Sequence, residues 1–149
     1  MQVPSCLYCG EGCEKVRGQH LISREEAFKR AERIKKEYEI IHGIEFQLYT
    51  AYIPLDRVIP TQGELSEVKL LVVLQEIKHG YDAPIIVLEC RGDYYVIDGH
   101  HRAFALRKLG FPEIEAIILK SRKDISLGVV ETAKKRKLTS LDDIKIVRG

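Results

Sequence analysis

The sequence predicts a small α+β domain with a mixed sheet, preceded by an amphipathic helix. Between residues 52 and 119, apolar runs and helical periods alternate in the order strand, helix, strand, strand, helix, strand. A separate helical period runs through residues 23–43. The chain has 149 residues, of which 45% are hydrophobic and 31% charged, so it is long enough for one buried core.

The first 22 residues form a polar lead-in without periodicity that carries three cysteines. Cys6, Cys9 and Cys13 have the spacing C-x2-C-x3-C, and His20 follows. Three thiolates and one imidazole can share a tetrahedral Zn²⁺, which would be structural because four protein ligands leave no position for a substrate. The alternative is reduced cysteines without metal, since no second C-x2-C pair is present.

Residues 23–43 predict an amphipathic helix. Ser23 and Glu26 have the spacing of a capping box, and Gly43 supplies a stop. We expect its apolar stripe to pack on the main domain or on a second copy of the chain, forming a homodimer. The stripe comprises Ala27, Ala31, Ile34, Tyr38 and Ile41.

The next segments predict a strand and a second helix. Pro54 and Pro60 confine the extended run QLYTAYIPLDRVIP to a sheet edge or to a broken strand. The segment from Glu64 to His79 predicts a helix that Gly80 ends. Because its centre reads VKLLVVL, we expect this helix to be largely buried.

A β-hairpin and a third helix follow. PIIVLEC and YYVID are apolar runs joined by a tight turn at Arg91 to Asp93. After Asp98 the period becomes helical, and Gly110 and Pro112 end that helix before the strand EIEAIIL. The apolar face of this helix comprises Ala103, Phe104, Leu106 and Leu109.

The C-terminal 30 residues carry an excess of positive charge. From Lys120 to Gly149 there are nine Lys or Arg and four Asp or Glu, so this segment has a net charge of +5, whereas the whole chain has a net charge of +2. A helix near Leu127 to Lys135 and an edge strand carrying Ile144 and Ile146 are expected here. The run KKRK at Lys134 to Lys137 favours nonspecific contact with nucleic acid, and a solvated helix end is the alternative.

These features divide the chain into four segments: residues 1–22, the helix 23–43, a domain at 50–120 and a basic tail at 121–149. No run of 18 apolar residues and no basic-then-apolar leader occurs, so we expect no membrane partner and a cytoplasmic location. The chain has no Asn or Trp and is rich in Lys and Glu, a bias typical of thermophilic proteins.

The stretch VIDGHHRAFALRKLG places polar residues where a strand leads into a helix. The first amides of a helix have no helical acceptor and lie at its positive end, so this corner predicts an anion site. Gly99 permits an unusual backbone angle and close approach of a ligand, and Arg102 adds a bidentate cation. His100 and His101 offer donors whose charge can follow pH near neutrality, and Asp98 can hold Mg²⁺ or accept a proton.

Ordinary capping is the structural alternative at this corner. In that interpretation Asp98 is the N-cap, Gly99 is a turn residue, and His100 and His101 are solvated residues of the first turn. Capping accounts for Asp98, but it does not account for two histidines and an arginine in succession. The phosphate-binding patterns of Walker type and of dinucleotide-binding type are absent.

Residues 52–119, and D-G-H-H-R above all, resemble the ParB/sulfiredoxin superfamily. The resemblance implies a small α+β fold in which Gly99, His100, His101 and Arg102 hold the phosphates of a nucleotide. Asp98 and these four residues all match the loop of the archaeal free serine kinases, the most similar branch. Sulfiredoxins have their nucleophilic cysteine where this chain has His100, so sulfinic acid reduction is not expected.

The likeness to the kinases implies ATP or ADP with Mg²⁺ and phosphoryl transfer to a small hydroxyl compound, serine first. Asp98 would orient the metal or the acceptor. The family's catalytic glutamate follows a proline, and here Gln62 stands at the matching position after Pro60, with Glu64 two residues on. Glutamine cannot act as a general base, so Glu64 is the candidate for that role.

Two alternatives stay open. The chain would be a noncatalytic nucleotide-binding regulatory or ParB-like partition module, or, with less support, a nuclease. The partition proteins have a G-E-R-R-like loop that binds a pyrimidine nucleotide, from which His100 and His101 depart. Thirty residues after Leu119 are too few for a helix-turn-helix domain, so sequence-specific DNA binding is not expected.

Overall fold

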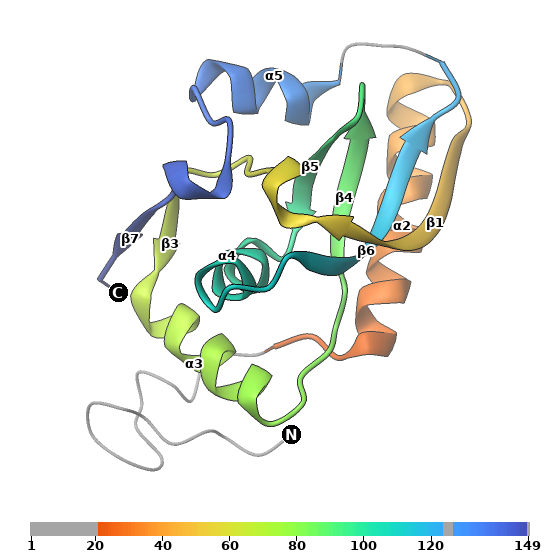
Figure 1. The fold of residues 1–149 in the computed structure, drawn as a ribbon. Coiled ribbons are helices and arrows are strands. Elements are labelled where there is room, and N and C mark those ends of the chain that lie inside the picture. Colours follow the sequence, from red (N-terminus) through yellow and green to blue (C-terminus); the bar gives the residue numbers. More distant parts are fainter. Residues whose placement is uncertain (1–20, 124–126, 149) are drawn as a thin grey trace.

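The computed structural model describes residues 21–123 and 127–148 and confirms the α+β class (Figure 1). Its main feature is a five-stranded mixed sheet with the order β1-β6-β4-β5-β2. A second sheet pairs β3 with β7. The strands are β1 Phe46–Pro54, β2 Val58–Ile59, β3 Glu64–Ser66, β4 Ile85–Cys90, β5 Asp93–Asp98, β6 Glu113–Ser121 and β7 Lys145–Val147.

Helix α2 (Arg24–His42) begins and ends where the sequence predicts. The Ser23 side chain accepts from the Glu26 amide, the Glu26 side chain accepts from the Ser23 amide, and Gly43 adopts a left-handed φ of 65°. Ala27 and Ala31 pack against Ile86 and Ile117 of the sheet.

The end of the predicted apolar stripe of α2 is wrong. Ile41 is 71% exposed. The contacts of the stripe end one turn earlier, at Tyr38, whose ring meets that of Phe46 at 5.6 Å. Ile41 is therefore exposed to solvent in the last turn, whereas the ring of His42 still lies 6.0 Å from that of Phe46.

Strand β1 is an edge of the sheet, as the prolines predict. It pairs antiparallel with β6 along its whole length, from Phe46 to Pro54. A 3₁₀ turn, η1 (Leu55–Arg57), then separates β1 from β2, which pairs parallel with β5 at the opposite edge.

The start of the predicted helix at Glu64 is wrong. Glu64 to Ser66 form strand β3, which pairs parallel with β7, a segment about 80 positions further along the chain. Helix α3 is Glu67–Lys78, and the Ser66 hydroxyl caps it by accepting from the Lys69 amide. Val72 and Val73 of α3 are fully buried, and Leu70, Leu74 and Ile77 are partly buried against the core, so the helix is less buried than expected but is packed along its apolar side.

The hairpin of β4 and β5 and the helix after it are confirmed. Helix α4 (His100–Lys108) buries Ala103, Phe104 and Leu106. Leu109 departs from the prediction, since it is 44% exposed at the C-cap position.

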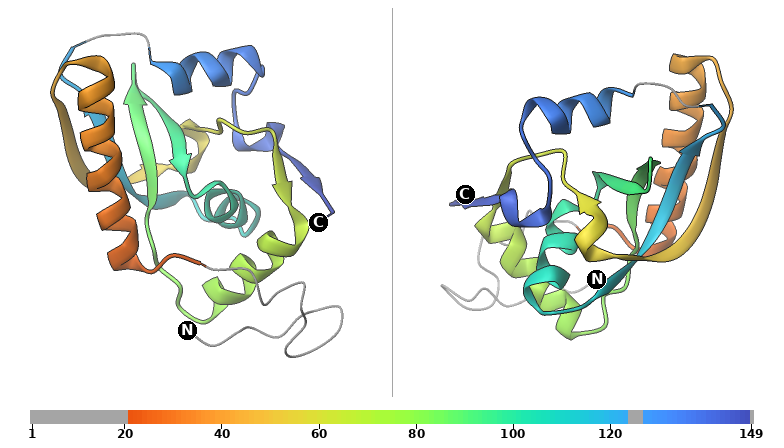
Figure 2. Two further views of the ribbon diagram at one scale, coloured as in Figure 1. Left: turned by 180° about the vertical axis from the view of Figure 1, so that it is seen from behind. Right: turned by 45° about the horizontal axis from the view of Figure 1, so that its top comes forward.

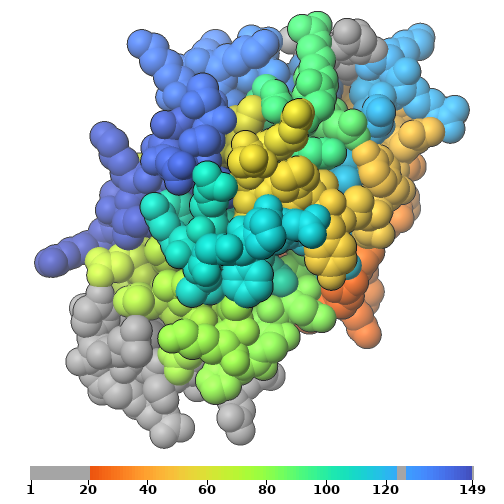
Figure 3. All heavy atoms as spheres, in the orientation of Figure 1, coloured from red at the N-terminus to blue at the C-terminus, as the bar shows by residue number. Residues whose placement is uncertain are grey.

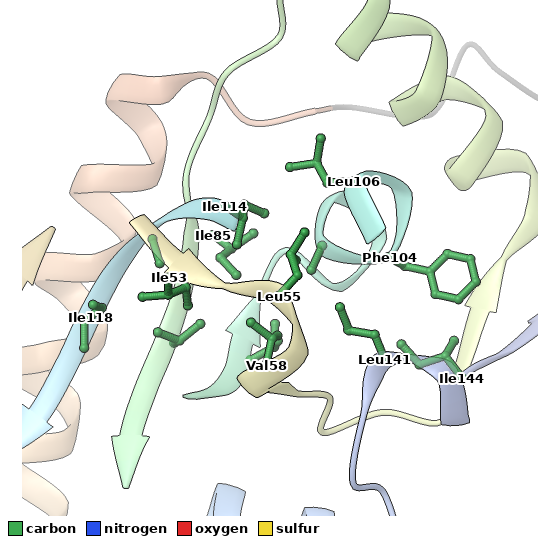
Figure 4. Packing of buried hydrophobic residues seen from close by; sticks show 14 of the residues in the cluster. Ile53, Leu55, Val58, Ile85, Phe104, Leu106, Ile114, Ile118, Leu141 and Ile144 are labelled. Atoms are coloured by element: carbon green, nitrogen blue, oxygen red, sulfur yellow. The ribbon is translucent and has the colours of Figure 1, made fainter. Parts of the chain in front are cut away.

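The core lies between one face of the sheet and α4 (Figure 4). Ile85 and Ile118 of the strands belong to one buried cluster with Leu55 of η1. Phe104 of α4 points away from the sheet, toward Leu141 and Ile144 of the same cluster. Helix α2 covers the opposite face of the sheet, which is visible from behind in Figure 2.

The C-terminal segment is packed into the fold. Val130 and Ala133 of α5 (Gly128–Lys135) join the cluster of Leu88 and Tyr95. Leu141, in the 3₁₀ turn η2 (Leu141–Asp143), enters the core beside α4. The helix predicted in the tail and its final strand are thus both present.

Within residues 21–123 and 127–148, no helix combines the length and the apolar character that a bilayer span needs.

Candidate functional site

A pocket of about 410 Å³ lies where β5 leads into α4. It is lined by all five residues from Asp98 to Arg102, together with side chains of α2, α3 and the segments that flank α3. Apolar side chains, among them Val73, Ile85 and Ile97, form part of its wall. The five residues that the sequence analysis selected at this corner therefore share one cavity.

Gly99 is required by the fold at this corner. It is the N-cap of α4 with a φ of 106°, a conformation that favours glycine. A Cβ at this position would lie 2.6 Å from Cγ2 of Ile85. The close approach that glycine permits is thus to β4, and the expectation that it serves a ligand is not needed to explain the residue.

Asp98 does not cap α4, because the N-cap is Gly99 and no side chain caps that helix. The alternative of ordinary capping is therefore wrong for this residue. Oδ2 of Asp98 accepts from Nη1 of Arg30 at 3.0 Å, and both side chains are about one-third exposed. Asp98 thus ties the end of β5 to α2 and keeps a partly exposed carboxylate at the pocket.

The first turn of α4 directs main-chain donors toward the start of the helix. The first helical hydrogen bond runs from the Ala103 amide to the Gly99 carbonyl at 3.0 Å. The amides of His100, His101 and Arg102 precede this bond and have no acceptor within the helix. They lie at the positive end of the helix dipole, as an anion site requires.

The two histidines line the pocket and also bind the segment that precedes α3. Nε2 of His100 accepts from the Thr61 amide at 2.9 Å, and Nε2 of His101 accepts from the Ser66 amide at 3.2 Å. A ring nitrogen that accepts carries no proton, so the neutral rings carry their proton on Nδ1. Each histidine therefore fixes the segment 61–66 and keeps one N–H to donate.

Both histidines are neutral at physiological pH. Burial, together with the neighbouring His101, lowers the pKa of His100 to about 4. Burial, together with the nearby Lys69 ammonium, lowers the pKa of His101 to about 4. The expectation that their charge follows pH near neutrality is therefore wrong, because desolvation disfavours the imidazolium.

Arg102 brings a partly buried cation to the pocket, and Asp82 and Glu115 are the acidic residues whose charges act on it. Its guanidinium lies over the ring of Tyr81, 4.9 Å from the ring centroid. Nε and Nη1 are buried and have no hydrogen-bond partner in the part of the chain that the structure describes. Burial lowers the pKa of this guanidinium, although a group of this kind stays protonated.

Three residues of the site were missed by the sequence analysis: Arg30, Lys69 and Tyr81. Lys69 had a signal, since it interrupts the apolar run VKLLVVL. Arg30 is one of many charged residues on α2 and had none. Tyr81 is held by a hydrogen bond from its hydroxyl to the Ile22 carbonyl at 2.7 Å, a contact that no local pattern indicates.

The charges at the pocket favour an anion. Arg30, Lys69 and Arg102 line it, whereas Asp98 is the one carboxylate among the lining residues of residues 21–123 and 127–148. Three permanent cations against one carboxylate leave an excess of positive charge beside the helix terminus.

Glu64 is not among the residues that line the pocket. It lies exposed on β3, opposite Lys145 of β7. Gln62 lines the pocket instead, and its Nε2 donates to the Glu64 carbonyl at 2.9 Å. The role of Glu64 as a general base stays a prediction.

The predicted zinc ligands Cys6, Cys9, Cys13 and His20 lie outside the described residues. Among the residues that are described, no group of three or more His, Cys, Asp or Glu side chains is placed to hold a metal. Zinc binding therefore stays a prediction from the sequence.

Comparison with known proteins gives a family match over residues 49–133, to the ParB N-terminal domain. An uncharacterized protein of Methanocaldococcus jannaschii is 36% identical over 121 residues, which are 80% of this chain and 45% of that protein. A nucleoid occlusion protein of Geobacillus thermodenitrificans is 31% identical over 117 residues, 73% of this chain and 42% of that protein. The chain thus spans less than half the length of these relatives.

Among solved structures, a protein of Agrobacterium tumefaciens has a TM-score of 0.53 at 15% identity, covering 67% of this chain and 63% of that one, and so shares the fold. A free serine kinase in complex with AMP has a TM-score of 0.42 at 27% identity, covering 46% of this chain and 30% of that one.

Proposed function

This chain belongs to the ParB N-terminal domain family, and from that premise we propose that its pocket binds a nucleotide by the phosphates. The observation that carries the proposal is the guanidinium of Arg102, whose Nε and Nη1 are buried and have no hydrogen-bond partner among the described residues. Buried donors without a partner destabilise a protein, and the phosphate of a ligand would accept from them and compensate the charge. Arginine also matches phosphate geometry with paired donors.

The surroundings of Arg102 support a phosphate more than a simple carboxylate. Three consecutive amides at the start of α4 precede its first hydrogen bond, and Lys69 adds a second cation at the pocket. The neutral rings of His100 and His101 keep Nδ1–H donors because Nε2 accepts in both. A phosphate has enough oxygen atoms to accept from several of these groups at once.

ATP or ADP is the nucleotide that we propose. The pocket volume of about 410 Å³ lies within the usual range for small-ligand sites, and its apolar side chains offer contacts for a nucleoside. The fit to Mg²⁺ is weaker, because Asp98 is the one lining carboxylate of the described residues and already accepts from Arg30. Mg²⁺ would therefore bind mainly through the nucleotide phosphates, with Asp98 as a protein ligand.

Phosphoryl transfer to a small hydroxyl compound is the candidate activity at this site. It is favoured by Asp98, which brings a partly exposed carboxylate to the pocket, where it can orient an acceptor hydroxyl. Most of the catalysis of phosphoryl transfer comes from positioning and charge neutralisation, which the cations of the pocket would supply. Asp98 is better placed for this role than Glu64, which is not among the lining residues.

The second candidate is a noncatalytic nucleotide-binding module. It is favoured by the relatives that are named nucleoid occlusion proteins and by the ion pair that already engages Asp98. In that case the basic run Lys134 to Lys137 at the end of α5 would contact nucleic acid nonspecifically. The same pocket would then control an interaction and would not transfer phosphate.

Nucleotide binding is tested by the melting temperature of the chain and of Arg102→Met with ADP or ATP, each with and without Mg²⁺. We expect saturating nucleotide to raise the melting temperature of the natural chain by about 5 °C and that of the variant hardly at all. Without nucleotide the variant should melt no lower than the natural chain, because it loses two buried donors that have no partner among the described residues and keeps most of the side-chain volume. Equal shifts in both proteins would contradict the site.

Catalysis is tested by phosphorus NMR on the chain with ATP, or with ADP, and a panel of small hydroxyl compounds that includes serine. A new phosphate ester that disappears with Asp98→Asn, while nucleotide binding persists, would support the transferase. Nucleotide binding without any product across the panel would favour the noncatalytic module.

A further inference from the structure

The two edges of the five-stranded sheet differ in length. β2 contributes two residues at one edge, whereas β1 contributes nine at the other. β1 pairs with β6 from Phe46 to Pro54 without a register shift, so the outer side of β1 is a regular strand edge within the described structure. Such an edge presents a row of amides and carbonyls that a further strand can pair with.

β1 also lacks the features that usually protect an edge. Its sequence FQLYTAYIP contains no charged residue, whereas β4, β5 and β6 each contain at least one. Tyr49 and Tyr52 are 41% and 68% exposed, and Thr50 between them is exposed as well. Figure 3 shows the gold atoms of this part of the chain at the molecular surface. Lysines, bulges or interior prolines would normally block pairing here.

We propose that β1 pairs antiparallel with β1 of a second copy of the chain and joins two sheets into one. A two-fold axis perpendicular to the sheet keeps each side chain on its own face, so residues opposite each other are both even or both odd in number. Full overlap of the strand from Phe46 to Pro54 places this axis at Thr50. Thr50 is then opposite Thr50 of the second copy.

The sequence of β1 suits this partner. With the axis at Thr50, Tyr52 of one copy stands opposite Leu48 of the other, a favourable aromatic–aliphatic pair that occurs twice. No charge faces a like charge along the strand, because neither strand carries any. A second copy also supplies a strand of the same length without charged residues, whereas a strand of another protein would have to be nine residues long and uncharged as well.

The test is a charge exchange at the two-fold axis. Sedimentation velocity is measured for the natural chain, for Thr50→Lys, for Thr50→Glu, and for an equal mixture of the two variants. We expect the natural chain to form a dimer whose fraction rises with concentration, and we expect the charge at position 50 to change the affinity of that dimer. Each variant alone should dimerise about tenfold or more weakly, because two like charges meet, and the mixture should regain the dimer.

Ile40→Lys is the matched control, since Ile40 is 82% exposed and belongs to α2 and not to β1. It should leave the dimer unchanged, and far-ultraviolet circular dichroism should show all variants folded. A natural chain that is monomeric at every concentration would overturn the proposal. So would a dimer that Ile40→Lys abolishes and Thr50→Lys leaves intact, because the contact would then be through α2. Recovery in the mixture would show that lost dimerisation is not misfolding.

Discussion

Replacing His100 by glutamine should remove part of the pH dependence of stability. Burial lowers the pKa of His100 from its ordinary value of 6.5 to about 4. Between these two values the unfolded chain binds a proton that the folded chain does not, so stability is lost as the pH falls through this window. The difference in pKa corresponds to about 3 kcal/mol in full, of which about 2 kcal/mol is lost between about pH 7.5 and pH 5.

Glutamine is the matched replacement because its side-chain oxygen can accept from the Thr61 amide, as Nε2 of His100 does at 2.9 Å, and it does not titrate. The measurement is urea unfolding at both pH values, followed by circular dichroism because the chain has no Trp. Carboxylates titrate in both proteins, so their contribution cancels in the comparison. If the natural chain and His100→Gln lose equal free energy of unfolding, His100 is not the buried neutral acceptor inferred here.

Three further predictions concern other contacts. Gly99→Ala should lower the free energy of unfolding in urea by about 3 kcal/mol, because the φ of 106° is strained for alanine and its Cβ would lie 2.6 Å from Cγ2 of Ile85. The control is Gly80→Ala, which has a φ of 92° and no atom within 4 Å of its Cβ and should cost only about 1 kcal/mol. Equal costs for the two variants would refute the role of Ile85. Glu115→Gln should cost about 1 kcal/mol, since its two oxygens accept from Arg24 at 2.5 and 2.6 Å at a partly exposed site; a cost that high salt does not reduce would contradict this origin. Metal analysis of chain purified without chelator should find about one Zn²⁺, lost in Cys9→Ser; less than about a tenth of an equivalent in the natural chain would exclude the site.

Sequence patterns located the candidate site but assigned several roles incorrectly. A strand followed by glycine and a helix can be recognised from residues 96–110 alone, because the change of period is local. The roles of His100 and His101 depend on the Thr61 and Ser66 amides, which lie 39 and 35 positions earlier in the chain. Lys69 and Arg30 reach the pocket from two other helices, and only packing brings them there.

The sequence by itself determined the elements that depend on interactions between neighbouring residues. The ends of α2 follow from Ser23, Glu26 and Gly43, whose side chains and backbone act within one helical turn. The tertiary structure alone decided that Glu64 to Ser66 form a strand, because their partner is Lys145 to Val147. It also decided that Ile41 is exposed and that Nε and Nη1 of Arg102 are buried with no hydrogen-bond partner among the described residues. Local hydrogen bonds and periodicity are written in neighbouring residues, whereas burial and pairing depend on segments that meet only after the chain has folded.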